Sequence, residues 1–263
     1  MCRHLAYLGP EVPIGRLLFE PPHSLYRQSW APRRQRHGTV NADGFGVGWY
    51  AEGDPVPARY RRSGPIWADG GITDLARVVR TTALLAAVRD ATVPSADGEA
   101  AAAPFAADRW LFSHNGAVAG WPDSLARIAS GLPPVDLLRL AARSDSAVVW
   151  ALVLARLRAG DDPGRALGDT VPEVASAAPD SRLNLLLTDG TAVAATAWGD
   201  TLWYRAEPGR GTAVASEPYD DDPLWQEVPD RTLLVATATD VQLSPLKEPS
   251  DASAPATPKE PRT

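Results

Sequence analysis

The chain has 263 residues, a net charge of −6 and 44% hydrophobic residues, which allows one large domain or two small ones with a substantial core. The acidic balance argues against nucleic acid or an anionic membrane surface as the main partner. We find no secretory signal and no apolar run of the roughly 20 residues that span a bilayer. A single cysteine forms no internal disulfide, so we expect a protein of the reducing cytoplasm.

The first predicted element is a short strand over residues 3–9, which begins beside the only cysteine, Cys2. If Met1 is removed, the thiol and the free α-amino group belong to one residue. An α-amino group has a pKa of about 7.7–8.0 and a thiol of about 8.5, so the amine can accept the thiol proton near neutral pH. N-terminal threonine enzymes use this arrangement. Chance placement of the cysteine is the alternative.

The next unusual segment lies between Asn41 and Tyr50, where three glycines alternate with large residues from Gly44 to Trp49. The alternation predicts a strand with glycine on one face, suited either to a ligand or to close packing of a second layer. Its spacing is not that of a dinucleotide-binding motif. Around it we predict a short helix or turn at 14–19, a loop at 28–38, strands at 58–62 and 109–113, a helix at 74–80, helix or strand at 83–90, and a mobile loop at 95–107.

The second half of the chain changes from helical to β-type patterns near residue 183. Helices are predicted at 122–131, 135–142, 147–159 and 162–177, and short strands at 183–188, 191–198, 201–205, 212–215, 233–237 and 241–243. Hairpin turns are expected at Asp189-Gly190 and Gly199-Asp200. Since no βαβ alternation occurs, we predict an α+β fold with helices over mainly antiparallel sheets. One domain would cover residues 2–247, followed by a disordered tail over 248–263.

Three further features could cooperate with Cys2. Asn115 and Gly116 follow a predicted strand and could give two donors to an oxyanion, although Asn-Gly is also a common turn. Arg89 interrupts an apolar run and could clamp a substrate carboxylate or form a structural salt bridge. Asp145, between two serines, could bind a substrate ammonium, although Ser144 or Asp145 could equally cap a helix. Together Arg89 and Asp145 would hold an amino-acid zwitterion.

Other kinds of site have weaker support. The four histidines and the cysteine show neither metal-ligand spacing nor the sequence pattern of papain-like proteases around Cys2. We therefore expect no metal and no cofactor, and the N-terminal amine remains the better base.

The order of the motifs resembles that of class II glutamine amidotransferases, which are N-terminal nucleophile hydrolases with a four-layer αββα sandwich. The matching segments are Met1–His4, Asn41–Gly48, Val88–Thr92, Pro104-Phe105, Phe112–Gly116 and Ser144–Ser146. The resemblance implies that Cys2 is the nucleophile and its amine the base, and that Asn115 and Gly116 form the oxyanion hole. It also implies that Arg89 holds the α-carboxylate of a glutamyl group and Asp145 its α-ammonium.

A second set of motifs is similar to one branch of that family, the amidohydrolases of ergothioneine biosynthesis. These motifs are Cys2–Leu5, Glu20–His23, Gln28–Pro32, Asn41–Trp49 and Ala215–Asp222. Enzymes of this branch remove the γ-glutamyl group from γ-glutamyl-hercynylcysteine S-oxide. Since the resemblance occupies nearly the whole chain, we expect no ammonia-accepting domain, and water as the acceptor. A stand-alone glutaminase subunit that delivers ammonia to a partner synthase, and an inactive glutamyl-binding module, are the alternatives.

The leaving group of such a small-molecule substrate carries a trimethylammonium group, which aromatic faces bind well. The sequence offers Trp30 and Trp49, and further Trp67 and Tyr219, with Asp220 to Asp222 as the opposite charge.

Overall fold

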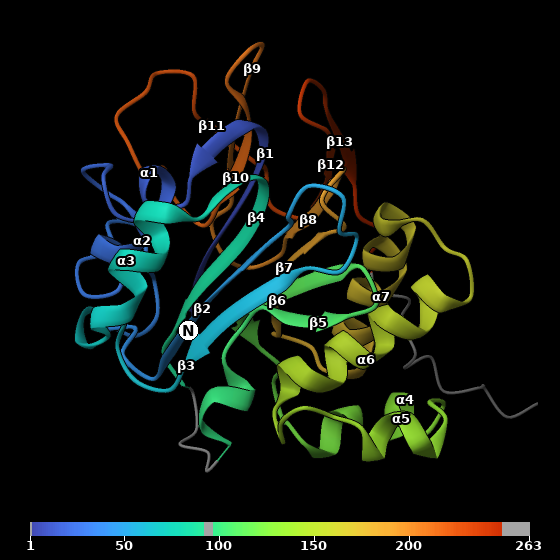
Figure 1. Ribbon diagram of the computed structural model, residues 1–263. Helices are drawn as coiled ribbons and strands as arrows, with labels where there is room; N and C mark the ends of the chain where they lie inside the picture. The colour runs from blue at the N-terminus through green and yellow to red at the C-terminus, as the bar shows by residue number, and fades with distance from the viewer. Residues whose placement is uncertain (1, 92–96, 249–263) are drawn as a thin grey trace, which may run out of the picture.

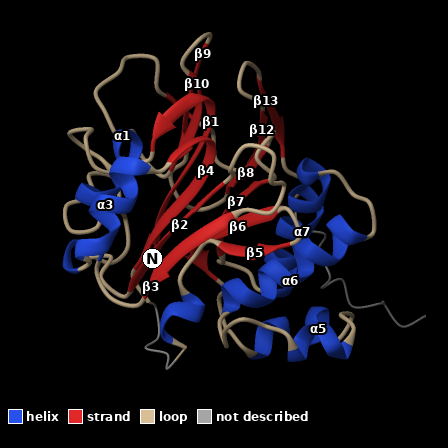
Figure 2. Cartoon of the chain, in the orientation of Figure 1, coloured by secondary structure: helices blue, strands red, loops and turns tan. Residues whose placement is uncertain are grey.

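The computed structural model describes residues 2–91 and 97–248, in which two antiparallel sheets lie face to face between two helical layers (Figure 1 and Figure 2). Three hydrophobic clusters fill the spaces between successive layers. The predicted four-layer αββα sandwich of α+β class is confirmed. Among the described residues, no helix combines the length and the apolar character needed to cross a membrane.

The first sheet has seven strands with β1 at its centre. In spatial order they are β11 (Gln226–Glu227), β9 (Trp203–Glu207), β10 (Gly211–Ala215), β1 (Cys2–Pro13), β4 (Arg80–Arg89), β2 (Gly44–Trp49) and β3 (Ala58–Arg62). Its outer face is covered by α1 (Gly15–Leu18), α2 (Leu25–Gln28), η1 (Ile66–Ala68) and α3 (Gly70–Val78). Along β1, Leu5 and Tyr7 pack under the helices while Ala6 and Leu8 face the other sheet, as a period of two requires.

The second sheet has six strands and carries the longer helices. In spatial order the strands are β13 (Val241–Pro245), β12 (Thr232–Ala236), β8 (Val193–Ala197), β7 (Arg182–Thr188), β6 (Trp110–Ala117) and β5 (Phe105–Ala107). The helical elements beyond it are η3 (Asp123–Leu125), α4 (Ala126–Ala129), α5 (Pro134–Leu138), α6 (Asp145–Arg158) and α7 (Pro163–Ala177), whereas η2 (Gly98–Ala101) lies against β2 and β3 of the first sheet. Phe112 of β6 stacks on Trp150 of α6 with centroids 5.0 Å apart, which fixes α6 against the sheet.

The glycine face of β2 serves close packing between the layers. A Cβ atom on Gly46 would collide with the carbonyl oxygen of Ala103, and one on Gly48 would lie 2.7 Å from Leu111. The glycines therefore let β6 and the segment before β5 approach the first sheet, which decides between the two interpretations of this strand.

Two predicted turns are absent from the structure, because strand pairing overrides local turn preference. Asn115 and Gly116 lie within β6, where they pair with Asn184 and Leu183 of β7, so the expected Asn-Gly turn does not form. The predicted hairpin at Gly199-Asp200 is also absent, because β8 belongs to the second sheet and β9 to the first.

Two other predictions concern segments of small or mixed residues. The ambiguous run at 83–90 belongs to strand β4, central in the first sheet. The mobile loop predicted over 95–107 is wrong where it is described, because η2 and β5 form there; residues 92–96 lie outside the described residues. Of the disordered tail predicted over 248–263, residues 249–263 also lie outside them.

Candidate active site

Strand pairing places the nucleophile beside a guanidinium group. Cys2, the first residue of β1, lies directly opposite Arg89 at the end of β4. Opposed residues of an antiparallel pair project from the same face. On β1 this face also carries Ala6, which packs between the sheets. The thiol and Arg89 therefore project together toward the second sheet.

Asn115 links the first residue of one sheet to the other sheet. The backbone nitrogen of Cys2 donates a hydrogen bond to Asn115 Oδ1 at 3.1 Å, and the Asn115 side chain is fully buried. Asn115 Nδ2 donates to Ser216 Oγ at 3.4 Å. An amide nitrogen carries two N–H groups, so one remains for a ligand beside the sulfur.

Gly116 lies at a point where no side chain fits. A Cβ atom there would meet the carbonyl group of Arg182, with the carbonyl carbon at 2.6 Å, and His114 Nε2 at 2.7 Å. The same carbonyl oxygen accepts a hydrogen bond from His114 Nε2 at 2.9 Å, and His114 Nδ1 lies within hydrogen-bond distance of Ser146 Oγ, at 3.0 Å. His114 thus ties this end of β6 to β7 and to α6.

Asp145 connects the start of α6 to the chain that leaves β6. Ser144 is the N-cap, since its hydroxyl oxygen accepts a hydrogen bond from the nitrogen of Ala147, which leaves Asp145 in the first turn. Asp145 Oδ2 accepts from the nitrogen of Val118 at 2.9 Å, and Oδ1 accepts from the nitrogen of Ser146 at 2.7 Å. A carboxylate has about four acceptor positions, so it can also bind an ammonium group.

These side chains meet in one cavity of about 480 Å³, which Cys2, Arg89, Gly116 and Asp145 line together. Asn115 does not itself line the cavity and is joined to it by the hydrogen bond that its Oδ1 accepts from the Cys2 nitrogen. Burial raises the pKa of the Cys2 thiol, while the positive charge of Arg89 opposes that rise. A raised pKa favours the protonated thiol over the thiolate, so a nearby base would assist attack by the sulfur.

The structure does not bring the proposed aromatic residues to this cavity. Trp30 packs against Tyr26 and Trp67, with centroids 4.8 and 5.7 Å away, and Trp49 packs against the outer cluster of the first sheet. Tyr219 is buried and bonds to Arg205, which also pairs with Asp220 and Asp222. The carboxylates at 220 and 222 are thus already neutralised by arginine, and Trp30 and Trp49 remain untested predictions.

Sequence reasoning missed two residues that position the site. Asp43 holds the segment that carries Arg89: its nitrogen donates to the Arg89 carbonyl at 2.9 Å, and its carboxylate accepts from the nitrogen of Ala91 at 2.8 Å. Ser216 Oγ accepts from the nitrogen of His4 at 3.0 Å and from Asn115. Asp43 lies within the motif Asn41–Trp49 and Ser216 within Ala215–Asp222, so the family resemblance was the one sequence feature that pointed to them.

Two further residues line the cavity without any signal in the sequence. Trp121 and Arg143 come from segments that flank the catalytic elements, one after β6 and the other before α6. Arg143 makes no ion pair with the described residues, although its backbone nitrogen bonds to Asp97. No group of three or more His, Cys, Asp or Glu side chains among the described residues could hold a metal ion.

Cys2 at the start of β1, the buried amide of Asn115 and Gly116 lie together where the two antiparallel sheets meet, and two such sheets between helical layers are the architecture of the N-terminal nucleophile class of amidohydrolases. The chain belongs to the class II glutamine amidotransferases, whose family profile matches residues 22–210. The resemblance noted in the sequence is confirmed.

Individual relatives narrow the comparison. The gamma-glutamyl-hercynylcysteine sulfoxide hydrolase of Mycolicibacterium smegmatis is 42% identical over 248 residues, which are 94% of this chain and 100% of that protein. A glutamine aminotransferase class-II domain protein from Silicibacter pomeroyi matches with a TM-score of 0.67 and 25% identity over 94% of this chain and all of that one. The glutamine phosphoribosylpyrophosphate amidotransferase of B. subtilis shares the fold, with a TM-score of 0.62 and 16% identity over 94% of this chain and 49% of its own.

Proposed function

We propose that this protein is an amidohydrolase that cleaves the γ-glutamyl amide bond of γ-glutamyl-hercynylcysteine S-oxide, releasing glutamate and hercynylcysteine S-oxide. The observation that carries the proposal is the shared cavity of Cys2, Arg89, Gly116 and Asp145, with the Cys2 nitrogen held by Asn115. The name of the 42% identical relative supports this choice of substrate.

Binding of the glutamyl group uses opposite charges on a strand of the first sheet and on the helix α6 that covers the second. Arg89 would hold the α-carboxylate through its guanidinium group, and Asp145 would accept hydrogen bonds from the α-ammonium. These contacts place the γ-carbonyl carbon near the sulfur of Cys2, and such positioning lowers the entropic cost of attack.

Catalysis then needs a base, an oxyanion hole and water. After removal of Met1, the free amine of Cys2 takes the thiol proton as sulfur attacks the γ-carbonyl carbon. The oxyanion accepts hydrogen bonds from the Gly116 N–H and Asn115 Nδ2. The C–N bond breaks as the ammonium returns its proton to the leaving nitrogen, which leaves a thioester. The amine next deprotonates water, which attacks the thioester and releases glutamate and the thiol.

The cavity also has residues for the leaving group. Trp121 offers an aromatic face to the trimethylammonium, and Arg143 offers a guanidinium group to a carboxylate of the departing amino acid. A catalytic thiol works best in a reducing compartment, which supports the cytoplasmic location that we expect.

The proposal is tested by measuring glutamate release from γ-glutamyl-hercynylcysteine S-oxide, from γ-glutamyl-p-nitroanilide and from glutamine. We expect the sulfoxide to be preferred, and Trp121→Ala to raise KM for the sulfoxide more than for the anilide. Trp30→Ala and Trp49→Ala serve as comparisons. Efficient glutamine hydrolysis that a partner synthase stimulates would favour the glutaminase alternative, and no turnover of any substrate would favour a binding module.

A further inference from the structure

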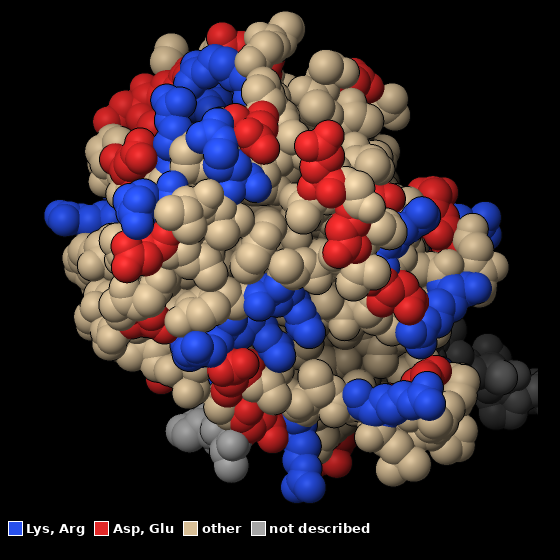
Figure 3. Space-filling model, viewed as in Figure 1, with Lys and Arg blue, Asp and Glu red and all other residues tan. Residues whose placement is uncertain are grey.

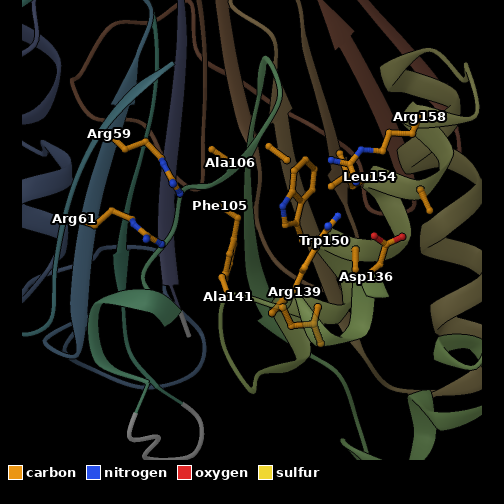
Figure 4. Close-up of a pocket in the computed structure, with 15 residues that line it drawn as sticks. Arg59, Arg61, Phe105, Ala106, Asp136, Arg139, Ala141, Trp150, Leu154 and Arg158 are labelled. Carbon is orange, nitrogen blue, oxygen red and sulfur yellow. The ribbon is translucent and has the colours of Figure 1, made fainter. Parts of the chain in front are cut away.

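A second cavity, of about 220 Å³, lies between the edge strand of the first sheet and the helices of the second. Figure 4 shows Arg59 and Arg61 reaching from β3 toward β5, with Arg139 and Arg158 on the opposite side. Among the described residues, Phe105 alone lines both this cavity and the active-site cavity. We define these four arginines and the space between them as the arginine cavity.

The positive charge of the arginine cavity is only partly neutralised, although Glu99 attracts Arg61 electrostatically. Arg158 pairs with Asp108 at 3.2 Å, whereas Arg59, Arg61 and Arg139 form no ion pair with the described residues. One carboxylate, that of Asp136, lines the space with them. In Figure 3, basic side chains gather near the middle of the face, over β3 and β5. Four guanidinium groups around one hollow concentrate a positive potential there.

The two arginines of β3 are held in place by carbonyl oxygens. Arg59 Nη1 donates to the carbonyl of Pro104 at 3.1 Å, and Arg61 Nη1 donates to that of Ala102 at 3.1 Å. Burial lowers the pKa of both groups; the charge of Arg61 lowers the pKa of Arg59 further, while Glu99 opposes the fall in the pKa of Arg61. Each guanidinium has five N–H donors, so several remain for a ligand, and a bound anion would relieve the mutual repulsion.

The remaining wall of the arginine cavity is apolar. It is formed by the rings of Phe105 and Trp150 together with Leu154 and small residues of α6. Binding sites commonly combine such a surface with a few charged groups that fix orientation, and their volumes are usually about 300–1,000 Å³. A cavity below that range suits a small ligand.

We propose that the arginine cavity binds a small organic oxyanion, a carboxylate or phosphate ester whose compact apolar body packs on Trp150 and Phe105. The planar guanidinium fork matches either oxyanion. The site is separate from the catalytic cavity, because Cys2, Arg89 and Asp145 do not line it.

The test is calorimetric titration at constant ionic strength with three probes: inorganic phosphate, phenyl phosphate and benzoate. We expect one site per chain, with phenyl phosphate or benzoate bound more tightly than phosphate because of the apolar wall. The tighter of the two organic probes identifies the oxyanion as phosphate or carboxylate. No saturable binding of any probe would overturn the proposal.

Single substitutions of arginine test whether the probes bind in the arginine cavity. Arg139 is exposed and its side chain has no ion pair among the described residues, so Arg139→Gln is expected to leave the thermal midpoint unchanged while weakening binding about tenfold. Arg127→Gln, an equal charge change on exposed α4, should leave affinity unchanged. Arg89→Gln should also leave it unchanged. Equal loss in Arg127→Gln, or loss in Arg89→Gln, would show non-specific or active-site binding and overturn the proposal.

Discussion

The two sheets supply different halves of the active site and hold them by different means. The first sheet contributes Cys2 and Arg89, which face each other through backbone pairing of β1 and β4. The second contributes Asn115 and, through α6, Asp145, whose side chains are oriented by hydrogen bonds to backbone nitrogens and a hydroxyl group. A side-chain substitution leaves backbone pairing in place, so the second half should be the more easily disturbed by mutation.

The largest expected effect is at the contact between the halves. Asn115→Ala removes an oxyanion donor and the acceptor of the Cys2 nitrogen, so we expect kcat to fall about 10²–10³-fold, as for other oxyanion donors. Ser113→Ala is the matched control, because Ser113 lies on the same face of β6 and bonds to His4. Equal losses in steady-state kcat for both variants would remove Asn115 from its catalytic role.

Substitutions of the two charged residues that would hold the glutamyl group should differ in their effect on the free energy of unfolding while both raise KM. Arg89→Gln should raise KM about 10–100-fold by removing a charge-assisted contact, with little effect on the free energy of unfolding, since its guanidinium group makes only a long hydrogen bond, of 3.4 Å, to the carbonyl oxygen of Asp43. Asp145→Ala should raise KM similarly and also cost about 1–3 kcal/mol, because the nitrogens of Val118 and Ser146 lose their acceptor.

Kinetic assays with urea unfolding measure both effects. An Asp145→Ala protein as stable as the parent, or an Arg89→Gln protein with unchanged KM, would contradict the account that the two sheets hold their site residues by different means.

Ser216 should act through Asn115 and not on the substrate. Ser216→Ala leaves one Asn115 N–H and the nitrogen of His4 without their acceptor, so the amide is less well oriented. We expect kcat to fall about tenfold while KM is unchanged, since each misplaced donor weakens transition-state binding alone. A rise in KM with kcat preserved would mean that Ser216 supports binding instead.

The smallest effect concerns pH and the interface between the sheets. His4 lies on β1 and bonds to Ser113 of β6; burial lowers its pKa to about 3 from an ordinary value near 6.5. The unfolded chain therefore gains a proton near pH 6.5 that the folded chain does not. The stability from neutral His4 is fully present above pH 6.5 and is lost as pH falls toward 3, by up to about 1.4 kcal/mol per pH unit.

Urea unfolding of the parent and of His4→Gln between pH 7 and pH 5 measures this dependence. We expect the variant to lose less stability than the parent over that range, because glutamine does not titrate. Parallel pH profiles would show that the buried imidazole takes no part.

Sequence patterns predicted most strands and the class of fold, because alternation and helical periodicity are local properties. The glycine strand, for example, is present at Gly44–Trp49. Local pattern does not reveal which strands pair with each other. β4 and the stretch around Asn115 are strands because they pair with distant segments. Gly199-Asp200 connects a strand of the second sheet to one of the first and therefore does not form a hairpin.

The residues of the candidate site also fall into those that the sequence indicated and those that only the structure revealed. Cys2 was found from its position, and the grouping of Arg89, Asn115 and Asp145 came from the family resemblance, since no spacing relates them. Trp121 and Arg143 enter the cavity from segments without a recognisable pattern. Asp43 and Ser216 lie inside noted motifs, but their roles depend on contacts with residues 48 and 101 positions away along the chain.

The most direct test of the account compares two forms of the protein that differ by one residue. Intact mass identifies protein with Met1 removed and protein with Met1 retained, and glutamate release from γ-glutamyl-hercynylcysteine S-oxide is measured for each. The account predicts turnover by the form with a free Cys2 amine and none above background by the other, because the peptide bond eliminates the base. Equal turnover by both forms would contradict it.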